Sequence, residues 1–553
     1  MKKALTLILT LSLLLCPLGV SAAEPQLQTA YGYAKLLNFG EFPENPKYEE
    51  GIATASIPQY NSAASATDST SKSDLQEIHE YLRECLINCV KEISLINYSK
   101  DHKLEVINTG KTDENGNIIY ICENLSKLIT ETTNYYPELF HVYKSYSYIF
   151  YYSETEKKYY VYALKPNYVN PDDRSEIYSD QATAKAAYDT ALKTYDDEIE
   201  HIISGITPQM TDLEKALYVH DYLVTHFQYD LRYYSNDPSV YDQKVHDVYS
   251  FFDQKVGVCE AYAQAFNGIM HRLGIKCTSA INDTEEHTWN IITLDGKNYH
   301  IDVTHDDPVG QSEGAAKHSL FLLSDETVIT KKDHSAWYSV MYNTSCTDNS
   351  YESGYAWNEA DSSFEYVDGK WYYINYLGPS NSSLYRTKDF INFETVVQSF
   401  DTTFPVPDKP GYSYIGYFGG ITAVGDSVYY SAPNRNIYCY NAKTDTVSDI
   451  TVTPPSSINT VTSCRYEGNG VLKVFFSLKP NSFDDGGSTT VTLFNIGDTD
   501  GDDKVSSTDI ANTKKYLLGS KTDFNWATVD FGNKKQVNIL DLVKIKKLAS
   551  TAN

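Results

Sequence analysis

The dipeptide Asp295-Gly296 constrains the fold more than any other feature of this chain. It stands between two runs rich in β-branched and aromatic residues, HTWNIITL and KNYHIDVT. Asp-Gly between two such runs is the signal for a two-residue type I′ hairpin. The turn fixes the register, because it pairs Leu294 with Lys297 and every later pair follows. A one-residue slip would move every side chain to the other face of the sheet.

This register predicts which side chains meet beyond the turn. His287 is expected to face Thr304, and Trp289 to face Asp302, with all four on one side of the sheet. His287 and Asp302 then become diagonal neighbours, about 7–8 Å apart at the backbone. Their side chains are long enough to form one hydrogen bond across that distance.

Upstream of the hairpin, Cys259 is predicted to begin a helix. Apolar residues recur after it at helical spacing, and Gly274 is a plausible stop; they are Tyr262, Phe266, Ile269, Met270 and Leu273. Unpaired amides and the helix dipole at an N-terminus favour a thiolate. We therefore expect a lowered pKa for Cys259 and a nucleophile near neutral pH.

Cys259, His287 and Asp302 together indicate nucleophilic catalysis. Taken singly, the cysteine favours a buried structural role and the histidine an ordinary strand position. Jointly they form a Cys-His-acid triad, in which His287 takes the thiol proton and Asp302 fixes the imidazole tautomer. The helix from Thr211, with a capping box to Glu214, carries His220 on its apolar side, which favours a core histidine.

The segment around these residues resembles the transglutaminase-like superfamily of papain-type fold. Three stretches carry the resemblance, which covers about residues 200–325: Gly257-Val258-Cys259, His287-x-Trp289-Asn290 and Tyr299-His300-x-Asp302-x-Thr304-x-Asp306-Asp307-Pro308. His305 departs from the family, in which Trp is usual at that place. The resemblance implies attack of Cys259 on an amide carbonyl and a thioester that an amine or water resolves. The Cys259 amide is the first candidate for the oxyanion donor, and Gln254 is a weaker one.

An acidic loop near the C-terminus predicts a calcium site. Asp498, Asp500, Asp502 and Asp509 stand at loop positions 1, 3, 5 and 12, and the carbonyl of Lys504 stands at position 7. Hard oxygen ligands at this spacing wrap one Ca²⁺. Position 6, where glycine is usual, holds Asp503, which predicts mild backbone strain.

A second copy of the loop and its helix follows 32 residues later. The duplication resembles a type I dockerin, which implies a cohesin domain of a scaffoldin as partner and a cellulosome-like complex degrading polysaccharide. Ser507 and Thr508, with Lys514 and Lys515, stand where that family contacts its cohesin. The second copy has Ile539 and Leu540 at the positions of Ser507 and Thr508. It also offers Gly532 and Lys534 in place of acidic ligands, so calcium is expected only at the first loop.

Composition excludes several classes of function. A net charge of -27 opposes binding to nucleic acid and anionic lipid. Lys2 and Lys3, an apolar run and small residues at 21–23 predict a secretory signal peptide, and no later stretch predicts a membrane span. Nine cysteines without a CxxC pair do not suggest zinc. We expect calcium in the C-terminal module and no cofactor for catalysis.

The predicted fold class is α+β, with a papain/transglutaminase-like core, an all-β domain of propeller-like or sandwich type and a small helical calcium module. The expected organisation is a signal peptide at 1–23, an N-terminal segment and linker at 24–74 and an α+β region at 75–180 that opens with a helix to Ile96. The catalytic domain follows at 181–345, then a β-rich repeat domain at 346–494 and the dockerin-like module at 495–553. The repeats VDGKWYYI and VGDSVYYS mark successive β units.

Two functions fit these patterns. The first is a secreted, extracellular cysteine acyltransferase or peptidase/amidase acting on a protein or peptide and docked to a cellulosome-like complex. The second is a catalytically inactive extracellular binding or adhesion protein that uses the papain-like and β-rich domains as a platform.

Overall fold

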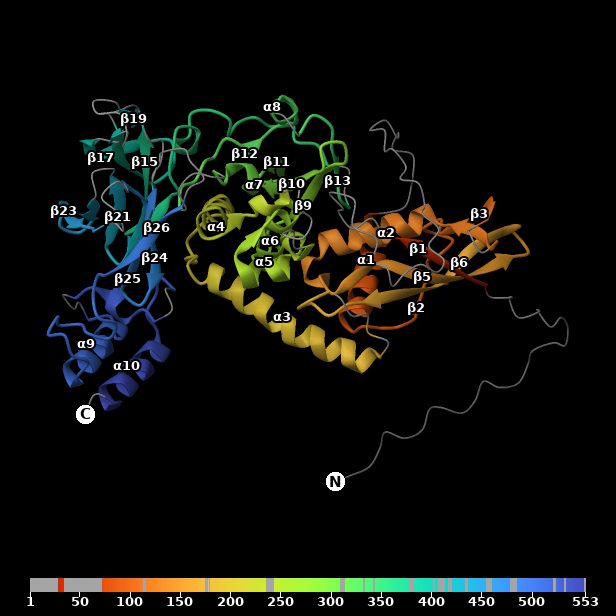
Figure 1. The fold of residues 1–553 in the computed structure, drawn as a ribbon, viewed down its shortest axis with the longest axis horizontal. Helices are drawn as coiled ribbons and strands as arrows, with labels where there is room; N and C mark the ends of the chain where they lie inside the picture. Colours follow the sequence, from red (N-terminus) through yellow and green to blue (C-terminus); the bar gives the residue numbers. More distant parts are fainter. Residues whose placement is uncertain are drawn as a thin grey trace, which may run out of the picture.

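The computed structural model describes residues 28–33 and 72–551, apart from short gaps at 113–115, 175–177, 179, 235–242, 309–313, 332–333, 342–343, 377–381, 401–402, 406–412, 416–419, 433–435, 454–459, 478–484, 521–523 and 532–533. The predicted signal peptide lies outside the described residues. Helices and strands are mixed along the chain, so the predicted α+β class is confirmed (Figure 1). Among the described helices, none combines the length and apolarity needed to cross a membrane.

An N-terminal sheet forms one end of the molecule (Figure 1). Its strand order is β1-β5-β6-β3-β4, with β2 paired to β6, and helices α1 and α2 accompany it. The bounds are β1 Gln28–Tyr33, α1 Lys72–Ile87, β2 Ile93–Ser94, β3 Glu105–Thr112, β4 Ile118–Ile121, α2 Glu123–Tyr135, β5 Val142–Ser153 and β6 Lys158–Tyr168. Strand β1 lies in a segment for which the sequence predicts no strand, and it pairs along β5.

Helix α1 ends earlier than predicted. It stops at Ile87 instead of Ile96 because Cys89 adopts a left-handed φ of 50° and Val90 donates its N–H to the carbonyl of Cys85 at 3.1 Å. Such a pair of features is a common helix ending. The chain then turns into β2.

The central part packs helices against one antiparallel sheet of order β12-β11-β10-β9-β13. Its elements are α3 Gln181–Ile203, α4 Asp212–His226, β7 Gln228–Tyr229, α5 Val248–Gln254, β8 Val256–Gly257, α6 Cys259–Arg272, β9 Cys277–Asn282, β10 His287–Leu294, β11 Lys297–Ile301, α7 Val303–Asp306, β12 Phe321–Leu323, α8 Asp325–Val328 and β13 Tyr338–Ser339. Helix α6 contacts β9 and β10 and buries Tyr262, Phe266 and Ile269 completely. This packing joins the start of α6 to the sheet.

The predicted hairpin is present with the predicted register. Leu294 pairs with Lys297, and the ladder continues to Asn290 and Ile301. Asp295 and Gly296 have φ values of 49° and 77°, and positive φ at both positions defines a type I′ turn. The strand stops at Ile301, so the pairing of His287 with Thr304 is wrong; Thr304 lies instead in the short helix α7.

Separate antiparallel sheets follow in chain order and confirm the β-rich character of this region. The first sheet contains β14 Glu365–Val367, β15 Lys370–Tyr376, β16 Ser382–Thr387 and β17 Phe393–Phe400, and the second pairs β18 Thr403–Pro405 with β19 Ser413–Ile415. The third contains β20 Ile421–Val424, β21 Ser427–Ala432, β22 Asn436–Asn441 and β23 Thr446–Thr451. The fourth contains β24 Thr460–Gly468, β25 Val471–Ser477 and β26 Asp485–Thr492. Strand β14 contacts β20, and β21 contacts β24. The four-stranded sheet that begins with β14 thus packs on the sheet that begins with β20, which in turn packs on the sheet that begins with β24.

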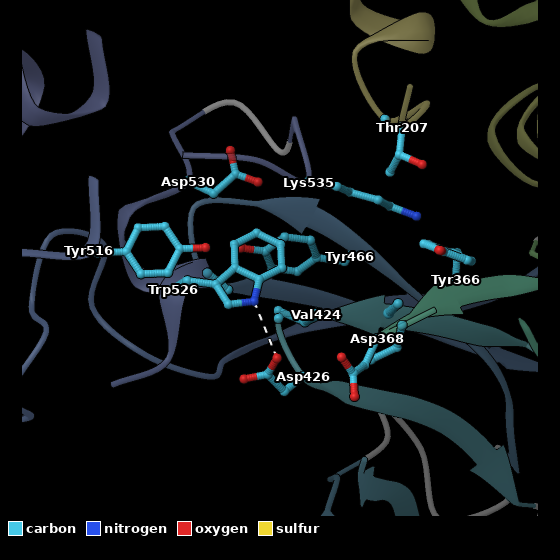
Figure 2. A pocket seen from close by; sticks show the side chains of 15 residues that line it. Thr207, Tyr366, Asp368, Val424, Asp426, Tyr466, Tyr516, Trp526, Asp530 and Lys535 are labelled. Carbon is cyan, nitrogen blue, oxygen red and sulfur yellow. Dashed lines mark hydrogen bonds between the residues drawn. The ribbon is translucent and has the colours of Figure 1, made fainter. Parts of the chain in front are cut away.

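The C-terminal module consists of α9 Ser507–Leu517 and α10 Ile539–Thr551, which contact each other. A cavity of about 270 Å³ lies where this module meets the β sheets and the loop after α3. Figure 2 shows Trp526, whose indole N–H donates to Asp426 at 3.3 Å, and Lys535, which also lines this cavity. Lys535 also pairs with Glu365 at 3.1 Å, so the module is held against the rest of the chain by polar contacts.

Candidate functional site

Cys259 is the first residue of α6, as the sequence predicts. It is only 6% exposed and packs against Ile281 and Val340. The glycine two residues earlier permits this approach, because a Cβ on Gly257 would lie 2.5 Å from the ring of Phe251 and 3.0 Å from the carbonyl of Val245. Close packing therefore requires glycine at the first position of the Gly-Val-Cys sequence, and the thiol at its third position is buried.

The expected low pKa of Cys259 is wrong for this closed setting. Burial raises the pKa of the thiol to about 12, and the backbone N–H groups of Thr288 and Glu260 oppose that rise. The helix N-terminus therefore contributes in the predicted direction, but desolvation of the thiolate outweighs it. Cys259 rests as a neutral thiol.

His287 and Asp302 are in direct contact. The imidazole Nε2 lies 2.6 Å from Oδ2 of Asp302, and both residues are buried. Asp302 follows the last residue of β11 and caps α7, where its Oδ1 accepts the N–H groups of Thr304 and His305 at 3.0 and 3.1 Å. The capping bonds hold the carboxylate still, so the position of the His287 ring is fixed as well.

Thr288 connects this pair to the thiol. Its backbone N–H points to Cys259, and it is the neighbour of His287 in β10. Because Nε2 of His287 is bound to Asp302, Nδ1 is the nitrogen that remains for a proton from elsewhere. The His287–Asp302 pair therefore lies on the hairpin next to the residue whose backbone N–H contacts Cys259 at the start of α6.

Trp289 and Asn290 hold the strand in place. The indole of Trp289 stacks on the His287 ring at 5.6 Å and donates to Nδ1 of His300. The amide of Asn290 donates to the carbonyl of Ala263 and to Asn267, both in α6, at 2.9 Å each. The His-x-Trp-Asn pattern thus ties β10 to the helix that begins with Cys259.

Two further histidines surround Asp302. Nδ1 of His305 and Nε2 of His334 lie 2.9 and 2.8 Å from the same Oδ2 that His287 contacts. Burial opposes ionisation, yet the imidazoles of His287 and His305 hold the pKa of Asp302 well below its usual range. The sequence gives no signal for His334, which lies in a loop 32 residues from Asp302.

Burial also lowers the pKa of His287, and Asp302 opposes this shift while His305 and His334 add to it. The resting centre therefore holds a neutral thiol and a neutral imidazole beside an ionised carboxylate.

Gln254, the weaker oxyanion candidate, is an exposed residue at the end of α5, whereas Cys259 is buried.

His220 is a core histidine, as predicted, but it is also charged. Its two ring nitrogens contact Asp221 at 2.8 Å and Asp306 at 3.2 Å, with no exposure to solvent. Although burial alone would lower it, these carboxylates raise the pKa of His220 to about 9. The ion pair joins α4 to α7, one turn beyond Asp302.

We expect the His220 pair to make stability depend on pH. The folded-state pKa is raised above the unfolded value of 6.5, so the stabilisation is complete below about pH 6.5 and is lost as pH rises through about 9. The free energy of unfolding should fall by roughly 2–3 kcal/mol over that window. Urea denaturation followed by tryptophan fluorescence measures it.

The matched control is His226→Gln in the same helix. Burial holds the pKa of His226 well below 6.5, so its ring stays neutral throughout the window and its replacement should keep the slope. In His220→Gln the slope should flatten. An equal slope in His220→Gln and wild type would contradict the assignment.

The first acidic loop brings three of its carboxylates together. Ligand oxygens of Asp498, Asp500 and Asp509 lie within 4.8 Å of one another. Asp503 at position 6 has a left-handed φ of 64°, which is the predicted strain. Asp502 and the carbonyl of Lys504 remain candidate ligands at the rim of this loop, and the donor set of carboxylate and carbonyl oxygens suits calcium.

The second loop has an internal cation in place of a metal. The ammonium of Lys534 lies 2.8 Å from each carboxylate oxygen of Asp541, the position-12 residue, which is completely buried. A calcium loop uses both oxygens of that residue to hold its ion. Lys534 therefore supplies the charge that calcium supplies in the first loop.

The predicted cohesin-contact residues are accessible. Ser507, Thr508, Lys514 and Lys515 are all exposed on α9. On α10, Ile539 and Leu540 are 63% and 64% exposed. The module thus presents one polar and one apolar helix face.

Comparison with known proteins gives two family matches. Residues 200–375 match the model of the transglutaminase-like superfamily, and residues 496–548 match the type I dockerin domain. Among solved structures, one titled "Crystal structure of a TGase" is 16% identical over 27% of this chain, with a TM-score of 0.19; the matched part spans 41% of that chain. No curated protein matches. The chain combines a transglutaminase-like core with a C-terminal type I dockerin domain.

Proposed function

We propose that this protein is a secreted cysteine acyltransferase or peptidase/amidase that a scaffoldin cohesin holds in a cellulosome-like complex degrading polysaccharide. The transglutaminase-like and dockerin domains together support a docked, enzyme-like protein outside the cell. The proposed catalytic residues are Cys259, His287 and Asp302. The observation that carries the proposal is the 2.6 Å contact of His287 with Asp302 beside the N-terminus of α6.

The neutral resting state defines the order of events. Nδ1 of His287 accepts the thiol proton as Cys259 Sγ attacks the carbonyl carbon of a bound amide. The carbonyl oxygen becomes an oxyanion, and the backbone N–H of Cys259 is the proposed donor that stabilises it. His287 then gives the proton to the leaving amine, the C–N bond breaks and a thioester forms on Cys259. His287 then takes a proton from the attacking water or acceptor amine, the C–S bond of the thioester breaks, and His287 returns the proton to the Cys259 thiolate.

The raised pKa of Cys259 makes His287 indispensable in this scheme. A thiol with a pKa near 12 provides almost no thiolate at neutral pH. Proton transfer must then accompany attack, and Asp302 stabilises the imidazolium that results.

The alternative is a catalytically inactive binding or adhesion protein. The burial and the raised pKa of Cys259 favour this alternative, because a buried, protonated thiol is unreactive unless a substrate and His287 activate it. In that case the β-rich sheets and the core would serve as a platform.

Trapping the thioester tests the proposal. The full chain is incubated with glutamine-donor proteins and with cell-wall peptides, and acyl adducts on the intact protein are measured by mass spectrometry together with released amine or ammonia. We expect an adduct in wild type and none in Cys259→Ala. Cys277→Ala is the matched control, because burial raises the pKa of that thiol too and it lies outside the triad.

Cys277→Ala should form the adduct at the wild-type rate. If wild type forms no adduct with any donor, the binding platform is the better account. If Cys259→Ala releases amine as fast as wild type, Cys259 is not the nucleophile.

A further inference from the structure

Four metal-binding side chains converge inside the candidate active site. One ring nitrogen each of His287, His305 and His334 and a carboxylate oxygen of Asp302 all lie within 4.8 Å of one another. They come from β10, from α7 and its cap, and from the loop before β13. A Cys-His-Asp triad uses only one of these imidazoles, so the other two have no role in it.

One more hydrogen-bond donor group faces the carboxylate of Asp302 than its two oxygens can accept. A carboxylate oxygen has about two lone-pair sites. Oδ1 uses its sites for the N–H groups of Thr304 and His305. Oδ2 then faces three imidazole nitrogens at 2.6, 2.8 and 2.9 Å. At most two of them can donate to it, whereas a cation between them would accept a lone pair from every one.

We propose that His287, Asp302, His305 and His334 bind a divalent transition-metal ion of the zinc class, with three nitrogen ligands and one oxygen ligand. Imidazole and carboxylate suit such ions, and four protein ligands suit a tetrahedral site. Metal–ligand bonds of about 2.0–2.1 Å place the ligand atoms about 3.3 Å apart, so the present contacts must open by about half an ångström. His305 is 38% exposed and provides the entry path.

The two other clusters of histidine and acid in the described chain do not compete. Both ring nitrogens of His220 contact carboxylates. Nδ1 of His300 accepts from Trp289, which leaves Nε2 with the proton that it donates to Asp325. The Asp302 centre is therefore the place for a soft or borderline ion, whereas the dockerin loop offers oxygen only.

A bound ion would switch off the proposed catalysis. It would take the Nε2 lone pair of His287 and the oxygen of Asp302 that orients the ring. With four protein ligands the ion would have no open position, so it would act as a reversible inhibitor and not as a catalyst. This consequence rests on the proposed function, but metal binding itself does not.

Cobalt titration of the untagged full chain tests the site. Excess calcium fills the dockerin loop first, and Co²⁺ is then followed by its visible absorption and by elemental analysis after dialysis. We expect one Co²⁺ per chain with the strong bands of tetrahedral coordination, displaced by Zn²⁺. His305→Trp should weaken binding by at least about 100-fold, because it removes a ligand at an exposed position. His201→Gln, an exposed histidine on α3 outside the cluster, should bind like wild type.

Weak binding that His305→Trp does not change, or octahedral spectra, would overturn the proposal. Tight cobalt binding by a chain that never forms an acyl adduct would sustain the metal site and refute only the proposed activity. An active chain that Zn²⁺ occupies without inhibition would refute the inhibitory role.

Discussion

Asp302→Asn is expected to lower kcat by about 10⁴-fold while the fold survives. The oxygen of the new amide would accept the N–H groups of Thr304 and His305, as Oδ1 does now. Its NH₂ group would then face His287, and it can only donate. Nε2 of His287 would have to accept, so the ring proton would move to Nδ1. An imidazole in that tautomer cannot take the proton of Cys259.

Asp325→Asn is the matched control for this prediction. Asp325, the first residue of α8, pairs with His300 of β11 at 2.9 Å outside the triad, so kcat should remain within a factor of about three. Circular dichroism and cohesin binding check that both variants fold. If Asp302→Asn kept kcat within tenfold of wild type, Asp302 would not orient the general base. Assays need a chelator of transition metals that spares calcium.

The hairpin and the helix start could be predicted because local signals decide them. Asp295-Gly296 fixes the register down to Asn290 and Ile301, and the apolar spacing after Cys259 fixes the start of α6. The prediction fails one residue later, since the Asp302 side chain accepts the N–H groups of Thr304 and His305 in α7 and the strand ends there. Side chains of this type compete with the sheet ladder for backbone amides.

The remaining features depend on contacts far apart in the sequence. His334 joins the centre from a loop with no periodic pattern, so its spacing gives no signal. The pKa of Cys259 depends on how deeply tertiary packing buries it, and the helix position alone predicts the wrong direction. Strand β1 was missed because its pairing partner, β5, lies more than 100 residues away.

Removal of calcium is expected to abolish cohesin binding through α9. The first calcium loop directly precedes this helix, and its carboxylates repel one another without metal. Partial desolvation and the charges of Asp509 and Asp502 raise the pKa of Asp500. If the loop binds calcium with a Kd of about 10⁻⁶ M, about 1 mM calcium stabilises the docking-competent form by about 4 kcal/mol. Chelation should therefore weaken binding by roughly three orders of magnitude.

The second loop should respond differently, because Lys534 already neutralises Asp541. Calorimetry on the full chain should detect one calcium in the dockerin and none at this loop. Lys534→Met is the reverse variant: it leaves the completely buried Asp541 without a cation and should destabilise the start of α10 by about 3–5 kcal/mol. Calcium binding at the first loop should remain as in wild type.

This asymmetry predicts which helix face a cohesin contacts. We predict that Ser507→Glu with Thr508→Glu prevents docking, whereas the same changes at Ile539 and Leu540 matter less. Chelation should reproduce the first variant, since only the α9 face depends on calcium. The exposed apolar side chains of α10 form the alternative docking surface. The loop before α10 contains the ion pair of Lys534 with Asp541, so its structure should not require calcium. If binding survived chelation and was lost in Ile539→Glu with Leu540→Glu, the cohesin would read α10 and docking would not require calcium. Acyl transfer at Cys259 should be unchanged in both variants, because neither touches the core.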